Sequence, residues 1–75
     1  MSERLTPAEV VELVTRRAAA AAAAIAATTL ARTATQNGTQ SAEFNRAAKD
    51  FNAAVDRAHA AGATDNDIRT AITGA

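Results

Sequence analysis

His59 is the only imidazole of the chain and the first residue to consider for chemistry. Asp56 and Thr64 lie close to it in the sequence, so acid–base chemistry is the role that these residue types would allow. A catalytic site of that kind needs a nucleophile or a paired carboxylate held by supporting residues, and the sequence shows no such set around His59. We therefore interpret His59 as a structural histidine and expect the protein not to be an enzyme.

The acidic run Asp65-Asn66-Asp67 has residue types found in calcium-binding loops, but it lacks their glycine turn and distal glutamate. Helix capping explains these side chains better. A single histidine and scattered carboxylates give no metal-ligand spacing, and the three glycines fall at predicted helix ends and not in a phosphate-binding loop. The sequence therefore predicts no catalytic residue, no bound metal and no cofactor.

Arg16 and Arg17 form the densest positive spot of the chain. Glu12 stands four residues before Arg16, a spacing that gives a favourable ion pair on a helix. A solvated helix face is the simplest interpretation of these charges. With a formal net charge of zero, the chain as a whole lacks the positive charge that attracts nucleic acid.

One segment, from Val55 to Ile72, joins a helix that ends in Ala-Gly-Ala-Thr to a short helix that reads Asp-Asn-Asp-Ile-Arg-Thr-Ala-Ile. Over this stretch, which is under a third of the chain, the sequence resembles the first part of a helix-turn-helix domain. The resemblance implies a DNA-associated transcriptional regulator, which is our alternative function; its recognition helix would begin near Thr73, so this C-terminal half is incomplete. Asp65 and Asp67 would repel phosphate, and we therefore expect a protein partner and not nucleic acid.

Large apolar residues are scarce in this 75-residue chain, which we expect to fold as a single small helical domain (1–75) with residues 1–5 as an N-terminal tail. Only twelve residues are Leu, Val, Ile or Phe, whereas alanine fills nearly a third of the positions. Alanine is the best helix former but adds little to a core. Without cysteine or a metal cluster, oligomerisation is the remaining way to stabilise such a small domain.

The start of the first helix is the most specific local signal. Thr6 is a good N-cap, Pro7 falls at the first helical position, and Glu9 completes a capping box. The helix then continues through good helix formers to about residue 36. Gly38 ends it, because glycine adopts the left-handed conformation that closes a helix.

Two further helices follow from the same kind of signal. Thr39 or Ser41 caps a second helix, and Thr64 caps a third. No segment of useful length alternates apolar and polar residues, so no strand is expected. The predicted fold is all-α, a long antiparallel helical hairpin (about 7–36 and 41–61) plus a short third helix (about 65–73).

Apolar residues recur at heptad spacing on both long helices, which is the pattern of a coiled-coil contact. Because the connecting turn is short, we expect these two stripes to face each other, with Phe51 as the most buried side chain of the hairpin. The third helix should fold back so that Ile68 and Ile72 cover Val10, Val11, Leu13 and Val14. The stripe of the second helix is Phe44, Ala48, Phe51, Val55, Ala58 and Gly62; that of the first is Val11, Val14, Ala18, Ala21, Ile25 and Thr28.

Leu30 lies opposite the stripe of the first helix, by the 100° rotation per residue, so we expect it to point outward from a smooth alanine surface. The sequence thus predicts a small non-enzymatic helical interaction or assembly protein, acting as a homodimer or bound to a larger protein. The alanine-rich stretch 18–31 is too short and too weakly apolar to span a bilayer, so we expect a cytoplasmic protein with no membrane partner. The predicted partner-binding residues are Ala19, Ala23, Ala26, Ala27, Leu30 and Ala34.

Overall fold

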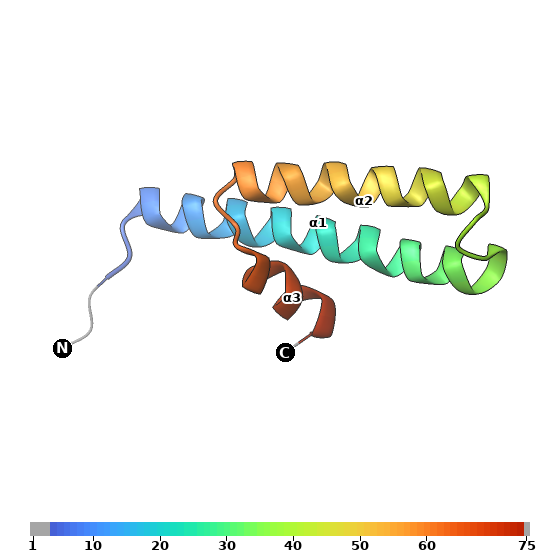
Figure 1. Cartoon of the computed structure of the whole chain (residues 1–75). Helices are drawn as coiled ribbons and strands as arrows, with labels where there is room; N and C mark the ends of the chain where they lie inside the picture. Colours follow the sequence, from blue (N-terminus) through green and yellow to red (C-terminus); the bar gives the residue numbers. More distant parts are fainter. Residues whose placement is uncertain (1–3, 75) are drawn as a thin grey trace.

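The computed structural model describes residues 4–74, over which the chain forms three α-helices and no strand. These helices are α1 (Pro7–Asn37), α2 (Ala42–Ala60) and α3 (Asp65–Thr73). Helix α2 runs antiparallel to α1, and α3 folds back across α1 (Figure 1). The first turns of α1 extend beyond both other helices. The predicted helical hairpin with a short third helix is therefore confirmed.

Hydrogen bonds at the start of α1 form the predicted capping box. The Glu9 N–H donates to Thr6 Oγ1 at 3.1 Å, and the Thr6 N–H donates to Glu9 Oε1 at 3.0 Å. The bond from the Thr6 N–H is the main reason why the pKa of the Glu9 carboxyl is lowered from its ordinary value of 4.5. At its other end, α1 stops before Gly38, whose φ of 82° is one that glycine adopts without strain.

The other two helices are capped in the same way. Ser41, and not Thr39, begins α2, because its Oγ accepts a hydrogen bond from the Phe44 N–H at 3.0 Å. A second capping box begins α3: the Asp67 N–H donates to Thr64 Oγ1 at 3.1 Å, and the Thr64 N–H donates to Asp67 Oδ2 at 2.9 Å. Because these hydrogen bonds form between residues close together in the sequence, the helix ends predicted from the sequence agree closely with those in the structure.

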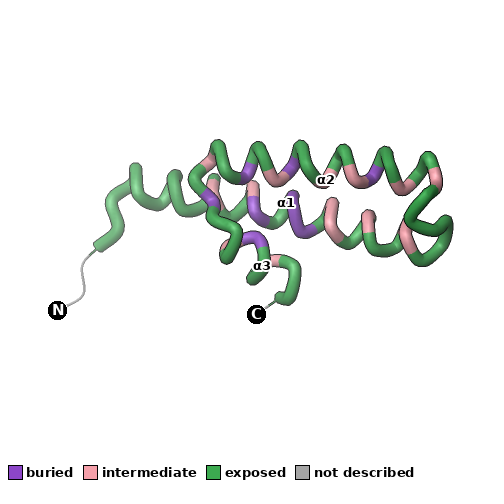
Figure 2. The backbone as a smooth tube through the Cα atoms, in the orientation of Figure 1, coloured by how far each residue is buried: buried purple, intermediate pink, exposed green. Residues whose placement is uncertain are grey.

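Small side chains form the core, which lies where the three helices meet (Figure 2). Among residues 4–74, Ile68 is the one large apolar residue that is buried, and the other buried residues are alanines. Methyl groups allow two helix backbones to approach closely, but each one removes little apolar area from water. The buried alanines are Ala20, Ala23, Ala24, Ala47, Ala54, Ala58 and Ala63.

Helix α1 packs through the face opposite to the predicted one. The core includes Ala20 and Ala23, whereas every residue of the predicted stripe is exposed. A shift of two residues is a rotation of about 200°, so it turns the stripe from the inside to the outside. Alanines lie on every side of the middle of α1, so the sequence there does not indicate which face contacts α2. The valines that defined the predicted face lie in the first turns of α1, beyond the end of α2. The exposed stripe is Val11, Val14, Ala18, Ala21, Ile25 and Thr28.

Phe51 is half-buried, so the prediction that it is the most buried side chain of the hairpin is wrong. Ala47, Ala54 and Ala58 form the buried line of α2. An aromatic ring in the middle of this contact would hold the two helices apart, so the small alanine side chains occupy it instead. The predicted stripe of α2 is therefore displaced to the side, with Phe44, Ala48, Phe51 and Val55 half-buried and Gly62 exposed.

The two isoleucines of α3 do not cover the valine cluster as predicted. Ile68 is buried in the alanine core, and Ile72 is 47% exposed. Because α3 begins only five residues after α2 ends, it lies beside the middle of α1, and of the predicted cluster only Leu13 lines the groove that α3 borders. The valine cluster is left exposed; it consists of Val10, Val11, Leu13 and Val14.

Replacing Thr6 with Ala should lower the free energy of unfolding by about 1 kcal/mol, because the Glu9 N–H loses its acceptor. Thr35→Ala is the matched control. Thr35 Oγ1 donates to the Ala31 carbonyl within α1, so its replacement inside the helix should leave stability unchanged or slightly raised. Urea denaturation followed by circular dichroism measures both variants. Equal effects would mean that the first turn of α1 contributes nothing.

Replacing Ala23 with Leu should destabilise the fold by about 1–3 kcal/mol, because Ala23 has no accessible surface and a larger side chain would force the helices apart. Ala53→Leu, on the exposed side of α2, makes the same chemical change and should cost less than about 0.5 kcal/mol. Thermal unfolding compares the two. If Ala23→Leu is tolerated as well as the control, the contact between α1 and α2 lies on another face.

Candidate functional site

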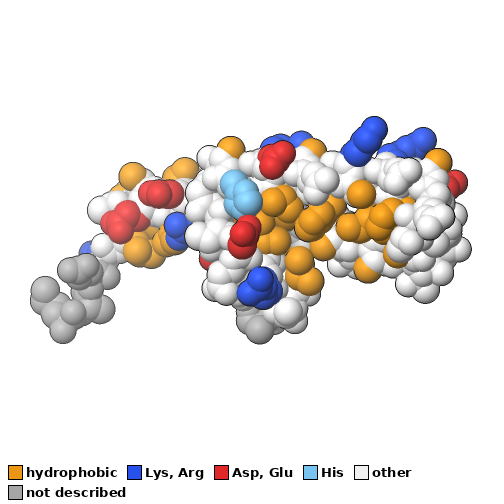
Figure 3. Space-filling view, in the orientation of Figure 1, with side chains coloured by type: hydrophobic (Ala, Val, Ile, Leu, Met, Phe, Trp, Pro, Cys, Tyr) orange, Lys and Arg blue, Asp and Glu red, His pale blue; other side chains and the backbone are white. Residues whose placement is uncertain are grey.

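The side of α1 that is turned away from α2 is the candidate functional site, and we call its exposed heptad stripe, residues 11, 14, 18, 21, 25 and 28, the outer face. Val11, Val14 and Ile25 on this face are 65%, 61% and 68% exposed. Val10 and Leu13 widen the apolar surface over the first turns of α1. Hydrophobic side chains are visible on these protruding turns, interrupted by acidic ones (Figure 3). Large apolar side chains gathered on an exposed face, with charged ones beside them, are typical of a protein-binding site.

A groove of about 820 Å³ lies beside the outer face, between α1 and α3. Ala21 and Ile25 line it from α1, and Ala71 and Ile72 line it from α3. Apolar side chains of another helix fit a groove of this type. The groove adjoins the outer face along Ala21, Ile25 and Thr28, and its lining also includes the charged side chains of Arg16, Arg17 and Asp67.

Arg16 helps to place α3 along this groove. It is half-buried, and a Cβ built on Gly62 would lie 3.9 Å from Arg16 Cδ, so its stem crosses to the turn between α2 and α3. The pKa of Asp67 is lowered mainly by the hydrogen bond from the Thr64 N–H, and the charge of Arg16 adds to the effect. The predicted ion pair between Arg16 and Glu12 is not formed, because Arg16 turns toward α3.

The predicted partner-binding residues lie on the inner side of α1. Ala23 has no accessible surface, and Ala19 and Ala26 pack against the core. The prediction that Leu30 points outward is wrong: Leu30 is half-buried, because the side opposite the stripe is the one that contacts α2. The chain itself covers much of this surface. The remaining predicted residues, Ala27 and Ala34, are half-buried as well.

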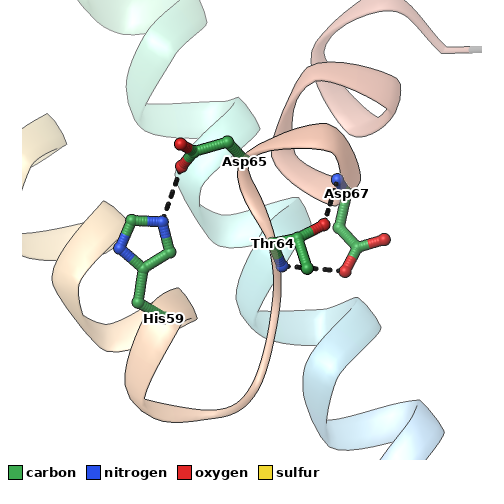
Figure 4. Close-up of polar contacts among 4 residues, drawn as sticks. All are labelled: His59, Thr64, Asp65 and Asp67. Carbon is green, nitrogen blue, oxygen red and sulfur yellow. Dashed lines mark hydrogen bonds and ion pairs between the residues drawn. The ribbon is translucent and has the colours of Figure 1, made fainter.

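His59 contacts one carboxylate at the junction of α2 and α3. Its Nε2 lies 2.7 Å from Asp65 Oδ1 (Figure 4), and the two side chains are 47% and 80% exposed. An exposed pair of this kind contributes at most about 1 kcal/mol. The nearby Asp67 carboxylate is engaged with Thr64. This arrangement lies at the junction of α2 and α3, where the Thr64 hydroxyl accepts a hydrogen bond from the Asp67 N–H.

Comparison with family models, curated proteins and solved structures finds no match to this chain. Within residues 4–74, no group of three or more His, Cys, Asp or Glu residues is placed to hold a metal ion. No helix of this described part is long and apolar enough to cross a membrane.

The heptad pattern identified the residues of the outer face, but the prediction that they contact α2 is wrong, because they are exposed. Helix α1 has 31 residues and α2 has 19, so an antiparallel hairpin leaves the first turns of α1 without a partner on α2. These turns contain four of the large apolar residues. The difference in helix length was the signal that these first turns are exposed, whereas no sequence signal showed which side of α1 faces outward farther along the helix.

Stability at low pH tests the capping carboxylate that positions α3. The pKa of Asp67 is lowered from its ordinary value of 3.8, so its ionised form stabilises the fold above that pH, and this contribution is lost as the pH falls through the lowered pKa. Asp67→Asn keeps an acceptor but cannot ionise, and its stability should therefore fall less with acid. Asp50→Asn, in the middle of α2, is the control and should follow the wild type. Thermal unfolding at neutral pH and at about pH 2.5 measures the difference. A wild-type acid profile for Asp67→Asn would contradict the role of this carboxylate.

Proposed function

We propose that this chain is a non-catalytic interaction module that binds a helix of another protein molecule through the outer face of α1. One observation carries the proposal: most large apolar residues are exposed, whereas the buried core consists of alanines and one isoleucine. Of the twelve Leu, Val, Ile and Phe residues, one is buried and seven are exposed. The exposed ones are Leu5, Val10, Val11, Leu13, Val14, Ile25 and Ile72.

The energetics of apolar burial favour a binding role. Each Å² of apolar surface removed from water contributes about 25 cal/mol, and alanine methyl groups supply little of it. The valines and isoleucines that could contribute most remain in water until another molecule covers them. A partner helix with apolar residues at heptad spacing would fit the stripe of the outer face.

DNA binding, the alternative, has less support. Helix α3 begins with Asp65 and Asp67, which disfavour contact with phosphate. Ile68 of the same helix is committed to the core. The formal net charge of zero provides no long-range attraction to nucleic acid. We therefore propose a protein partner.

Site-specific photocrosslinking tests the proposal. A benzophenone amino acid at position 14, on the outer face, should form covalent adducts with protein in the cells that express the chain. The same amino acid in place of Asn52, which is exposed on α2, is the control and should form few adducts. Adducts with any protein, a second copy included, at position 14 alone support the proposal. A lack of adducts at position 14, or equal yields at both positions, would contradict it.

A further inference from the structure

We infer that the molecule bound by the outer face is a second copy of this chain, packed antiparallel about a twofold axis that passes between Ala18 and Ala21. This inference rests on the proposed function and names its partner. It commits to one geometry, in which residue 14 of each copy faces residue 25 of the other. Three features carry it: the exposed area, the self-complementary stripe, and the matching of protrusion and groove.

The folded chain exposes more surface than a compact monomer of its mass. Its accessible surface is 5602 Å² for 7.7 kDa, whereas a compact monomer of that mass exposes about 4,300 Å². The excess of about 1,300 Å² exceeds the roughly 800 Å² that each partner contributes to an interface of standard size.

The stripe is complementary to itself when it is read in the opposite direction. An antiparallel pair centred between Ala18 and Ala21 places these two alanines against each other at the axis. Val14 of each copy then lies opposite Ile25 of the other, about 8 Å along the helix from the axis. Small residues at the crossing point let the two α1 helices touch, and larger ones fill the space where the helices diverge.

Each copy also has a protruding segment, the first turns of α1, and a groove between α1 and α3 that the protruding segment of the other copy could occupy. In this register the first turns of α1, with Val10 and Val14, lie beside Ile25 and Thr28 of the second copy. The groove between α1 and α3 opens there, and the half-exposed Ile72 lines it. The part of α1 with no partner inside the chain is therefore the part that enters the groove of the other copy.

Charge does not oppose the pairing. The formal net charge of each copy is zero, so two copies do not repel each other at long range. The six positions of the outer face include no charged residue, so the contact between the two stripes buries no charge. Arg16, Arg17 and Asp67 lie beside it and line the groove between α1 and α3. Arg32, the next position of the same heptad series, falls in this register near the first turn of the other α1, which contains Glu9.

Sedimentation and light scattering of the purified full chain from about 1 μM to about 1 mM test the inference. The wild type should convert from monomer to dimer within that range. Val14→Asp should weaken the dimer by about a hundredfold, because each dimer would bury two carboxylates without partners. Val14 is exposed in the single chain, so the variant should keep its helix content by circular dichroism. Asn52→Asp adds the same charge on α2 and should dimerise like the wild type.

A charge-pairing experiment tests the register. Ile25→Lys alone should also be monomeric, but mixing it with Val14→Asp should restore a heterodimer, because positions 14 and 25 face each other across the axis. Val11→Lys, which faces residue 28, is the matched control and should not restore association with Val14→Asp. Rescue by both lysine variants, or by neither, would overturn this register.

The oligomeric state separates this inference from the proposed function. A wild-type chain that stays monomeric to about 1 mM, while position 14 crosslinks to other proteins in cells, would overturn the homodimer and leave the interaction module standing. A monomer without crosslinks at position 14 would overturn both. A dimer that Val14→Asp leaves intact would place the contact on another surface and overturn the inference.

Discussion

The contact between α1 and α2 is made by alanine methyl groups, and the rest of the structure depends on it. Ala23 and Ala58 have no accessible surface, which requires the two backbones to approach closely. A contact this narrow has no room for a phenylalanine at its centre, so Phe44 and Phe51 lie at its edges. It also buries little apolar area, and helix propensity and helix capping therefore become a larger part of the stability than in a domain with a bulky core.

The choice of the alanine face leaves the outer face without a partner in the chain. A helix in a hairpin buries one side, and α3, with nine residues, covers only a part of α1 next to the core. The valines, Leu13 and Ile25 then remain in water as a consequence of the internal packing. The same packing that buries little apolar area inside the chain thus leaves the largest apolar side chains of α1 exposed, which is why we propose that this surface binds another molecule.

The turn between α2 and α3 determines the shape of that surface. The Thr64–Asp67 capping box begins α3 at a defined residue, and the His59–Asp65 pair and the stem of Arg16 hold it close to the end of α2 and the side of α1. Ile68 then enters the core and Ile72 lines the groove. Polar groups that first suggested catalysis or metal binding therefore contribute to the placement of one short helix.

The sequence by itself determined the helix class, the three helices and their ends, because capping boxes, Pro7 and glycines with positive φ act within a few residues. It also contained the outer-face stripe as a heptad pattern. Tertiary structure alone decided which side of α1 faces inward, since alanines surround the helix from Ala18 to Ala24 and carry no directional signal. That decision depends on how closely two backbones can approach, a property of both helices together that no local pattern of one helix contains.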